Sequence, residues 1–184
     1  MEIFRTLVII IAVAFAGMAA IAAAATPPGR LTGGQIYDLP GWFKKSFLVL
    51  GEDLQEAKAQ GRHVLLFFHL SECPYCARLL EENLRRGETK DFTEQHFDVI
   101  AIDIRGGKSV EWFDGKTYTE KALATDLKVI ATPTMVFVDG TGKTVLRLNG
   151  YRQPRAFRQA LDYVHQRQYR SQSLASYVEK QNNK

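Results

Sequence analysis

The sequence is short of cysteine, of internal repeats and of any long block of charge of one sign. It holds two cysteines among 184 residues, which is too few for a fold stapled by several disulfides. The formal net charge is +4, and the basic residues are scattered apart from modest clusters at 152–155 and 167–170. We therefore expect an ordinary soluble surface and no nucleic-acid partner.

Candidate metal ligands are also sparse. The four histidines, His63, His69, His96 and His165, show no repeated ligand spacing, and two cysteines supply only half of a tetrahedral zinc site. Covalent haem attachment would need a histidine directly after the second cysteine, where Ala77 stands. We predict no metal and no other cofactor, with a copper carrier that uses one distant histidine left open as an alternative.

The N-terminal residues 1–25 have the plan of an export signal. An uncharged apolar run from Leu7 to Ala25 ends in a small-residue A-x-A site before Thr26. This is typical of a secretory signal peptide, and the run is also long enough for an uncleaved membrane anchor. Either interpretation places the protein outside the cytoplasm, which in a bacterium is the periplasm. Residues 26–40 are rich in glycine and proline and are predicted to form a flexible linker.

Hydrophobic periodicity predicts alternating helices and strands in the rest of the chain. Helices are expected at 51–60, from the second cysteine to about 86, at 119–127 and at 154–164, and strands at 64–69, 97–103, 134–139 and 144–148. Residues 104–119 are expected to form a long loop with room for a hairpin. The polar tail 169–184 is expected to hold a short helix near 174–178 or to fray. This order implies an α/β fold with helices on both faces of a central sheet, and a parallel first strand pair.

Both cysteines lie in one motif, Cys73, Pro74, Tyr75 and Cys76, between an apolar strand and a helix. The start of a helix favours negative charge, and the thiolate is the reactive form of cysteine. Pro74 suits a first helical turn, where its missing N–H is no loss. We interpret the motif as the centre of a thiol–disulfide oxidoreductase. The alternative, an inert structural bridge, would close a very short loop and add little stability.

Three segments together resemble the thioredoxin superfamily: the C-x-x-C motif, residues 131–134 (Ala-Thr-Pro-Thr), and the turn at 139–143. The resemblance implies a thioredoxin-like domain over residues 41–168, built on a mixed sheet of about four to five strands. It also implies that Pro133 is cis and faces the cysteines. Thr132 and Pro133, together with Pro74 and Tyr75, would then contact a client protein.

A narrower set of residues, at 46–48, 113–116, 120–124 and 150–157, is similar to the SoxW-like branch of exported thioredoxins. This resemblance implies a periplasmic reductase of client disulfides. Its electrons would come from a membrane thiol transporter of the CcdA/DsbD kind.

The motif predicts a two-step exchange. Cys73 would attack a client disulfide, and Cys76 would then resolve the mixed disulfide. Classical thioredoxins bury an aspartate where this chain has Phe67, so the group that takes the proton of Cys76 is not assigned. Glu72, solvent and His69 are the candidates, and we name Glu72 and His69 as residues that tune the site.

Other functions stay open from the sequence. An oxidase of the DsbA type carries a large helical insertion, for which residues 77–132 leave too little room, and residues 26–40 are too short for the dimerisation domain of a DsbC-type isomerase. Reductase is the direction that remains. The alternatives are an oxidase or isomerase, or a non-catalytic copper- or client-binding module on the same fold.

Overall fold

The structure is a computed structural model that describes residues 36–183. The predicted signal peptide or anchor, and linker residues 26–35, lie outside the described residues. In the part that is described, no helix is both long and apolar enough to cross a membrane.

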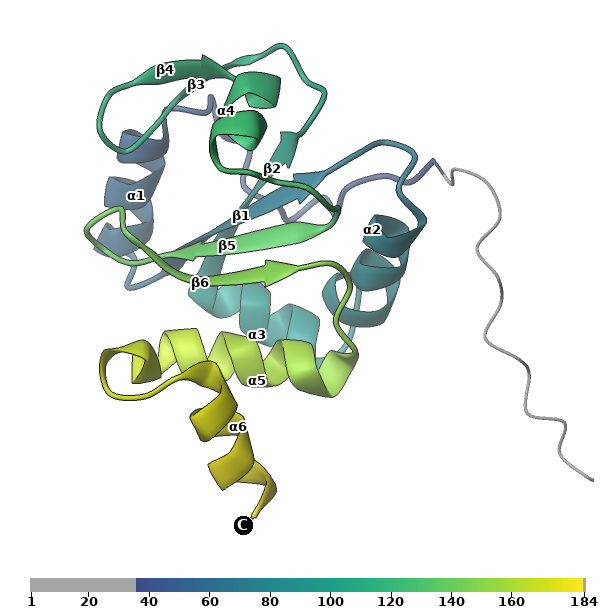
Figure 1. The fold of residues 1–184 in the computed structure, drawn as a ribbon, viewed down its shortest axis with the longest axis vertical. Helices are drawn as coiled ribbons and strands as arrows, with labels where there is room; N and C mark the ends of the chain where they lie inside the picture. Colours follow the sequence, from purple (N-terminus) through teal and green to yellow (C-terminus); the bar gives the residue numbers. More distant parts are fainter. Residues whose placement is uncertain (1–35, 184) are drawn as a thin grey trace, which may run out of the picture. The chain divides into compact units, whose positions relative to one another are not determined.

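A four-stranded mixed sheet forms the centre of the fold (Figure 1). Its order is β2 (Phe97–Asp103), β1 (His63–His69), β5 (Thr134–Val138) and β6 (Thr144–Asn149). β1 runs parallel to β2 and antiparallel to β5, and β5 pairs with β6 in a hairpin. Because β1 and β5 are buried almost throughout, they are the central strands. The prediction of a mixed sheet with a parallel first pair is confirmed.

Alternate residues of β1 point to opposite faces of the sheet and pack in two separate cores, because the side chains of a strand alternate. Leu65 and Phe67 pack with α2 (Pro74–Leu79) and α5 (Pro154–His165). Leu66 and Phe68 pack with α1 (Leu50–Ala59) and α4 (Glu120–Asp126) on the other face (Figure 1). The prediction of helices on both faces is confirmed, and the two cysteines belong to the first of these cores.

The helix predicted after the cysteines is present, but its last turn is π-helical. α2 passes into one π-helical turn, η1 (Leu80–Leu84), and Gly87 then separates it from α3 (Glu88–His96). Sequence periodicity missed α3, because Phe92 is the one large apolar residue among its nine. Gly87 has a φ of 84°, a left-handed conformation that glycine adopts without strain.

The less regular segments hold short elements. β3 (Ser109–Glu111) and β4 (Thr117–Thr119) form the hairpin for which 104–119 had room. A 3-10 turn, η2 (Gln168–Arg170), leads to α6 (Leu174–Asn182), which is longer than the predicted helix because buried Tyr177 anchors it to the first core. Phe43 also packs in the first core, where its ring meets Phe67 at a centroid distance of 5.9 Å.

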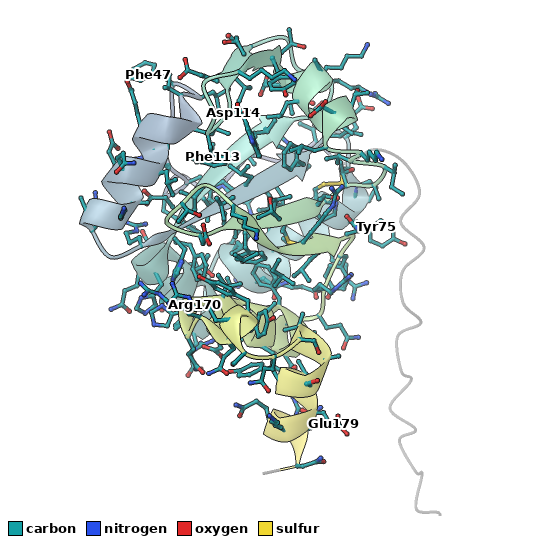
Figure 2. The ribbon with its side chains drawn as sticks, turned by 60° about the vertical axis from the view of Figure 1, so that its left-hand side comes forward. Phe47, Tyr75, Phe113, Asp114, Arg170 and Glu179 are labelled. Carbon is teal, nitrogen blue, oxygen red and sulfur yellow. A yellow bond between two sulfur atoms is a disulfide. The ribbon has the colours of Figure 1, made fainter. Side chains whose placement is uncertain are left out.

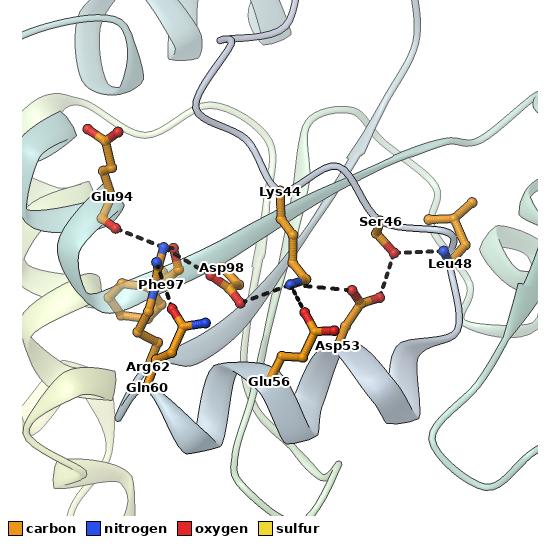
Figure 3. Close-up of polar contacts among 10 residues, drawn as sticks. All are labelled: Lys44, Ser46, Leu48, Asp53, Glu56, Gln60, Arg62, Glu94, Phe97 and Asp98. Atoms are coloured by element: carbon orange, nitrogen blue, oxygen red, sulfur yellow. Dashed lines mark hydrogen bonds and ion pairs between the residues drawn. The ribbon is translucent and has the colours of Figure 1, made fainter.

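A charged network fastens the segment before α1 to the sheet (Figure 3). The Lys44 backbone N–H donates to the Val99 carbonyl on β2 (2.9 Å). The Lys44 ammonium lies 3.8 Å from Asp53, 2.5 Å from Glu56 and 3.6 Å from Asp98. Burial raises the pKa of Asp53, whereas the nearby ammonium lowers it. Lys44 therefore compensates carboxylates that would be costly to bury alone.

Candidate redox site

The redox motif lies where β1 gives way to α2. Cys73 is the N-cap residue of α2, and its sulfur accepts a hydrogen bond from the Cys76 backbone N–H (3.0 Å). The two residues are joined by a disulfide with a Cα–Cα distance of 5.1 Å. Cys73 is 5% exposed and Cys76 is 0% exposed. Cys73 is therefore the sulfur that a second molecule reaches first.

The loop before β5 faces the cysteines. The Thr132–Pro133 peptide bond is cis, as the resemblance implied. The Thr132 hydroxyl donates to the Cys73 sulfur at 3.3 Å. The Gly150 N–H donates a hydrogen bond to the Pro133 carbonyl (2.7 Å), which fixes the loop to the end of β6. A sulfur that carries negative charge would be stabilised by the Thr132 hydroxyl and the Cys76 amide together.

The residues predicted to contact a client differ in how far their side chains are exposed. Tyr75 is 54% exposed and points away from the fold on the side of the disulfide (Figure 2). Pro74 is half-buried within the first turn of α2, and Pro133 is buried. Ile130, three residues before Pro133, is 90% exposed. Sequence reasoning missed it, although a large apolar side chain close to the Thr132–Pro133 pair was a visible signal.

The two residues predicted to tune the site have different surroundings. Glu72 is exposed, and its carboxylate has no hydrogen bond within residues 36–183. His69 ends β1, and its ring stacks on Phe67 with a centroid distance of 5.7 Å and an interplanar angle of 13°. Since Phe67 packs with both cysteines in one buried cluster, His69 belongs to the face that carries the redox pair.

Tyr37 is a further residue at this end of the sheet. Its hydroxyl donates to the Leu70 carbonyl (2.6 Å) and lies 3.0 Å from Nδ1 of His69. Neighbouring residues reinforce this docking: the Asp38 carbonyl accepts from Arg85 (2.7 Å), and the Trp42 indole N–H donates to the Leu84 carbonyl (2.9 Å). Tyr37 falls within the predicted linker, where no periodic pattern marks a packed residue.

A buried carboxylate supports the next strand. Glu120 is 3% exposed, and it accepts hydrogen bonds from the Asp103 and Lys108 backbone N–H groups (3.2 Å each). Its position depends on Gly106, because a Cβ there would lie 2.0 Å from a Glu120 oxygen. Asp103 is the β2 partner of His69. The charges of Asp103 and Glu120 both act to raise the pKa of the His69 imidazole.

The other three histidines gather at the opposite end of β1. The rings of His96 and His165 lie 4.0 Å apart between centroids, and those of His63 and His165 lie 6.1 Å apart. Their sequence positions gave no hint of this convergence. Within residues 36–183, no group of three or more histidine, cysteine or acidic residues is arranged to hold a metal ion.

Comparison with known proteins places this site in a family context. Residues 50–165 match the family model described as a thioredoxin-like domain. The chain is similar to the disulfide bond reductase DsbH of Chlamydia pneumoniae, with 26% identity over 98 residues, which are 53% of this chain and 58% of that protein. The match thus spans little more than half the length of this curated relative.

Solved structures agree with the fold. A thioredoxin-fold protein from Helicobacter pylori matches with a TM-score of 0.59 and 25% identity, over 67% of this chain and 86% of its own. A thioredoxin from Thermus thermophilus matches with a TM-score of 0.50 and 29% identity, over 63% of this chain and 83% of its own. The cysteine pair and these relatives support thiol–disulfide exchange as the general type of reaction.

Proposed function

Because the chain belongs to the thioredoxin-like family, through the domain match over residues 50–165, we propose that it reduces disulfides in exported client proteins. One observation carries the proposal. The Cys73 sulfur, which is less buried than that of Cys76, is bonded to Cys76 and faces a cis-proline loop whose Thr132 hydroxyl reaches it at 3.3 Å. In this arrangement a client meets the Cys73 sulfur first, and the Cys76 sulfur stays buried until the second step.

The reaction follows from the unequal burial of the two thiols. In the reduced protein, the Cys73 thiolate attacks one sulfur of a client disulfide, and the other client sulfur leaves as a thiolate. Cys76 then attacks Cys73 in the mixed disulfide. The second client sulfur leaves, and the Cys73–Cys76 disulfide forms. The client gains two electrons and the cysteine pair loses two, so the oxidised pair must be reduced again before the next cycle.

The direction of exchange is part of the proposal. Between Cys76 and Pro133 the described chain holds the rest of α2, η1, α3, β2, the β3–β4 hairpin and α4. It has no separate helical domain there of the kind that marks DsbA-type oxidases. The Chlamydia relative is a disulfide bond reductase by name, which also favours reduction. We assign the protein to the periplasm, with residues 1–25 as its signal or anchor, and a membrane thiol transporter as its electron donor. Membership of the SoxW-like branch stays a prediction.

A trapping experiment tests the reaction and its direction. Cys76→Ser should accumulate a mixed disulfide between Cys73 and a model client such as insulin, whereas Cys73→Ser should accumulate none. The wild-type protein, supplied with a dithiol, should reduce insulin, and Cys73→Ser should abolish the turnover. Absence of both turnover and trapping in the reduced wild type and Cys76→Ser would overturn the proposal.

A redox titration separates reduction from oxidation. A reductase should equilibrate with glutathione at a potential more negative than that of the exported oxidases. A potential near that of DsbA, with oxidation of a reduced client faster than reduction of an oxidised one, would reassign the protein as an oxidase.

A further inference from the structure

The two paired sheet residues beneath the redox helix, Phe67 and Ala101, carry no acidic or basic group. Phe67 on β1 is fully buried with both cysteines, and its partner across the parallel ladder is Ala101. Neither side chain can take a proton. The proton that Cys76 must lose in the second step therefore needs an acceptor elsewhere on this face.

His69 is the titratable side chain next in line on the same face. It lies two residues beyond Phe67, so the two side chains point to the same side of the strand. The stacked rings place the imidazole against Phe67, which is a member of the buried cluster that contains both cysteines. Exposed Glu72, in contrast, has no partner within residues 36–183 that would hold its carboxylate toward the thiols.

The hydroxyl of Tyr37 fixes which nitrogen of His69 carries hydrogen. A phenol has one proton, and that of Tyr37 is directed to the Leu70 carbonyl at 2.6 Å. The Tyr37 oxygen also lies 3.0 Å from His69 Nδ1, so in this contact it accepts. Nδ1 must then carry the hydrogen, and in a neutral imidazole Nε2 is left with its lone pair free.

The charges around His69 suit a group that takes a proton briefly. Burial lowers the pKa of His69, so the ring is neutral at neutral pH. Asp103 on β2, the Leu70 carbonyl and Glu120 on α4 act to raise this pKa, and Lys108 acts to lower it. Burial and Asp103 raise the pKa of Tyr37, so its hydroxyl remains protonated. The two carboxylates would stabilise the imidazolium once it forms.

We propose that His69 Nε2 accepts the Cys76 proton during resolution of the mixed disulfide, and that Tyr37 is the positioning residue that sets its tautomer. This inference rests on the proposed disulfide exchange. A water molecule carries the proton from the Cys76 thiol to Nε2 as the Cys76 sulfur attacks Cys73. The Cys73–Cys76 bond forms, the bond from Cys73 to the client breaks, and the client sulfur departs with the electron pair. The imidazolium then returns its proton to the departing thiolate or to solvent.

Single-turnover kinetics test the acceptor. In His69→Gln, formation of the mixed disulfide should keep its wild-type rate, whereas its resolution should slow by about tenfold or more at neutral pH. The wild-type resolution rate should rise with pH through an inflection below the ordinary histidine pKa, and this inflection should vanish in His69→Gln. The matched control is His63→Gln, at the other end of the same strand, which should leave both steps unchanged.

Tyr37→Phe tests the tautomer without removing the imidazole. Nitrogen-15 NMR of the wild type should show His69 protonated at Nδ1, and Tyr37→Phe should show a mixture of both tautomers with resolution slowed several-fold. Wild-type turnover with an unchanged rate and pH profile in His69→Gln would overturn the acceptor role alone. An unchanged tautomer in Tyr37→Phe would overturn the positioning role. A wild type that forms no mixed disulfide with any client would instead overturn the proposed function itself.

Discussion

The two ends of β1 carry the same residue in opposite surroundings. His63 begins the strand and His69 ends it, and burial lowers the pKa of both. His63 is surrounded by positive or potentially positive groups, chiefly His165 and Arg167, and its pKa falls to about 4. His69 faces two carboxylates and a tyrosine hydroxyl instead.

The difference shows that burial alone does not make a histidine useful as a base. A buried imidazole becomes a proton acceptor only where neighbouring charges can support the imidazolium. At His63 the charges of His165, Arg167 and His96 oppose protonation, and the ring packs against Phe97 at a centroid distance of 5.4 Å. At His69, Asp103 and Glu120 favour protonation and Lys108 opposes it. The same strand, β1, therefore begins with a structural histidine, His63, and ends with a candidate reactive one, His69.

The two ends also differ in how tightly they are packed. The far end has an open basic hollow with a cavity volume of about 270 Å³, lined in part by Lys58, Arg62 and Arg170. Arg170 is labelled there in Figure 2. At the redox end, the backbone of Gly106 packs closely against Glu120, since a Cβ at this glycine would lie 2.0 Å from a Glu120 oxygen.

Alanine at a glycine of each end should give the largest contrast. Gly106→Ala places a methyl group 2.0 Å from a Glu120 oxygen, and we expect it to cost about 3 kcal/mol of unfolding free energy. Gly140→Ala in the far-end turn meets its nearest atom, in the Lys58 side chain, at 3.9 Å, and should cost under about 0.5 kcal/mol. Urea unfolding measures both. Equal losses would mean that the redox end is no more tightly packed than the far end.

Acid should destabilise the protein through His63 more than through His69. The unfolded chain binds this proton near pH 6.5 and the folded chain only near pH 4, so stability is lost as pH falls between these values. The wild type should lose unfolding free energy between about pH 7 and pH 4.5, and His63→Gln should make this loss smaller by about 2 kcal/mol. His69→Gln should make it smaller by less, because Asp103 and Glu120 partly offset the lowering of the His69 pKa by burial.

These two variants are compared by urea unfolding at each pH, against the same series for the wild type. An equal effect of the two substitutions would contradict the contrast drawn between the ends of β1. So would a wild-type stability that does not fall between neutral and mildly acidic pH.

The smallest expected effect concerns a single hydroxyl. Thr132→Ala removes the donor to the Cys73 sulfur, and we expect the thiolate to lose about 1 kcal/mol, which raises the Cys73 pKa by roughly 0.7 unit. Thr141→Ala removes a similar hydroxyl contact, to Asp139 in the far-end turn, and should leave the thiol unchanged. Ultraviolet absorbance of the thiolate during a pH titration measures the shift. A lowered Cys73 pKa in Thr132→Ala would contradict the role given to that hydroxyl.

Local patterns predicted much of this arrangement. The strand before Cys73, the helix after it and the Thr132–Pro133 pair are recognisable because each depends on neighbouring residues or on a short motif. α3 escaped because a surface helix with one apolar side chain lacks the periodicity that burial imposes. The contact of Tyr37 with His69 and the gathering of three histidines escaped for another reason. They depend on how distant segments meet, which no local pattern records.

The docking of residues 37–42 has a practical consequence for anyone who immobilises or labels the protein. Tyr37 and Asp38 hold the chain against the β1–α2 turn and against Arg85, just beyond η1, so a support attached directly at residue 36 would lie close to the redox pair. The C-terminal α6 packs beyond α5, away from that turn (Figure 1). A surface that captures the protein through its C-terminus would leave Cys73 open to large clients. Capture through the N-terminal side would crowd the same sulfur and make a competent protein look selective for small ones.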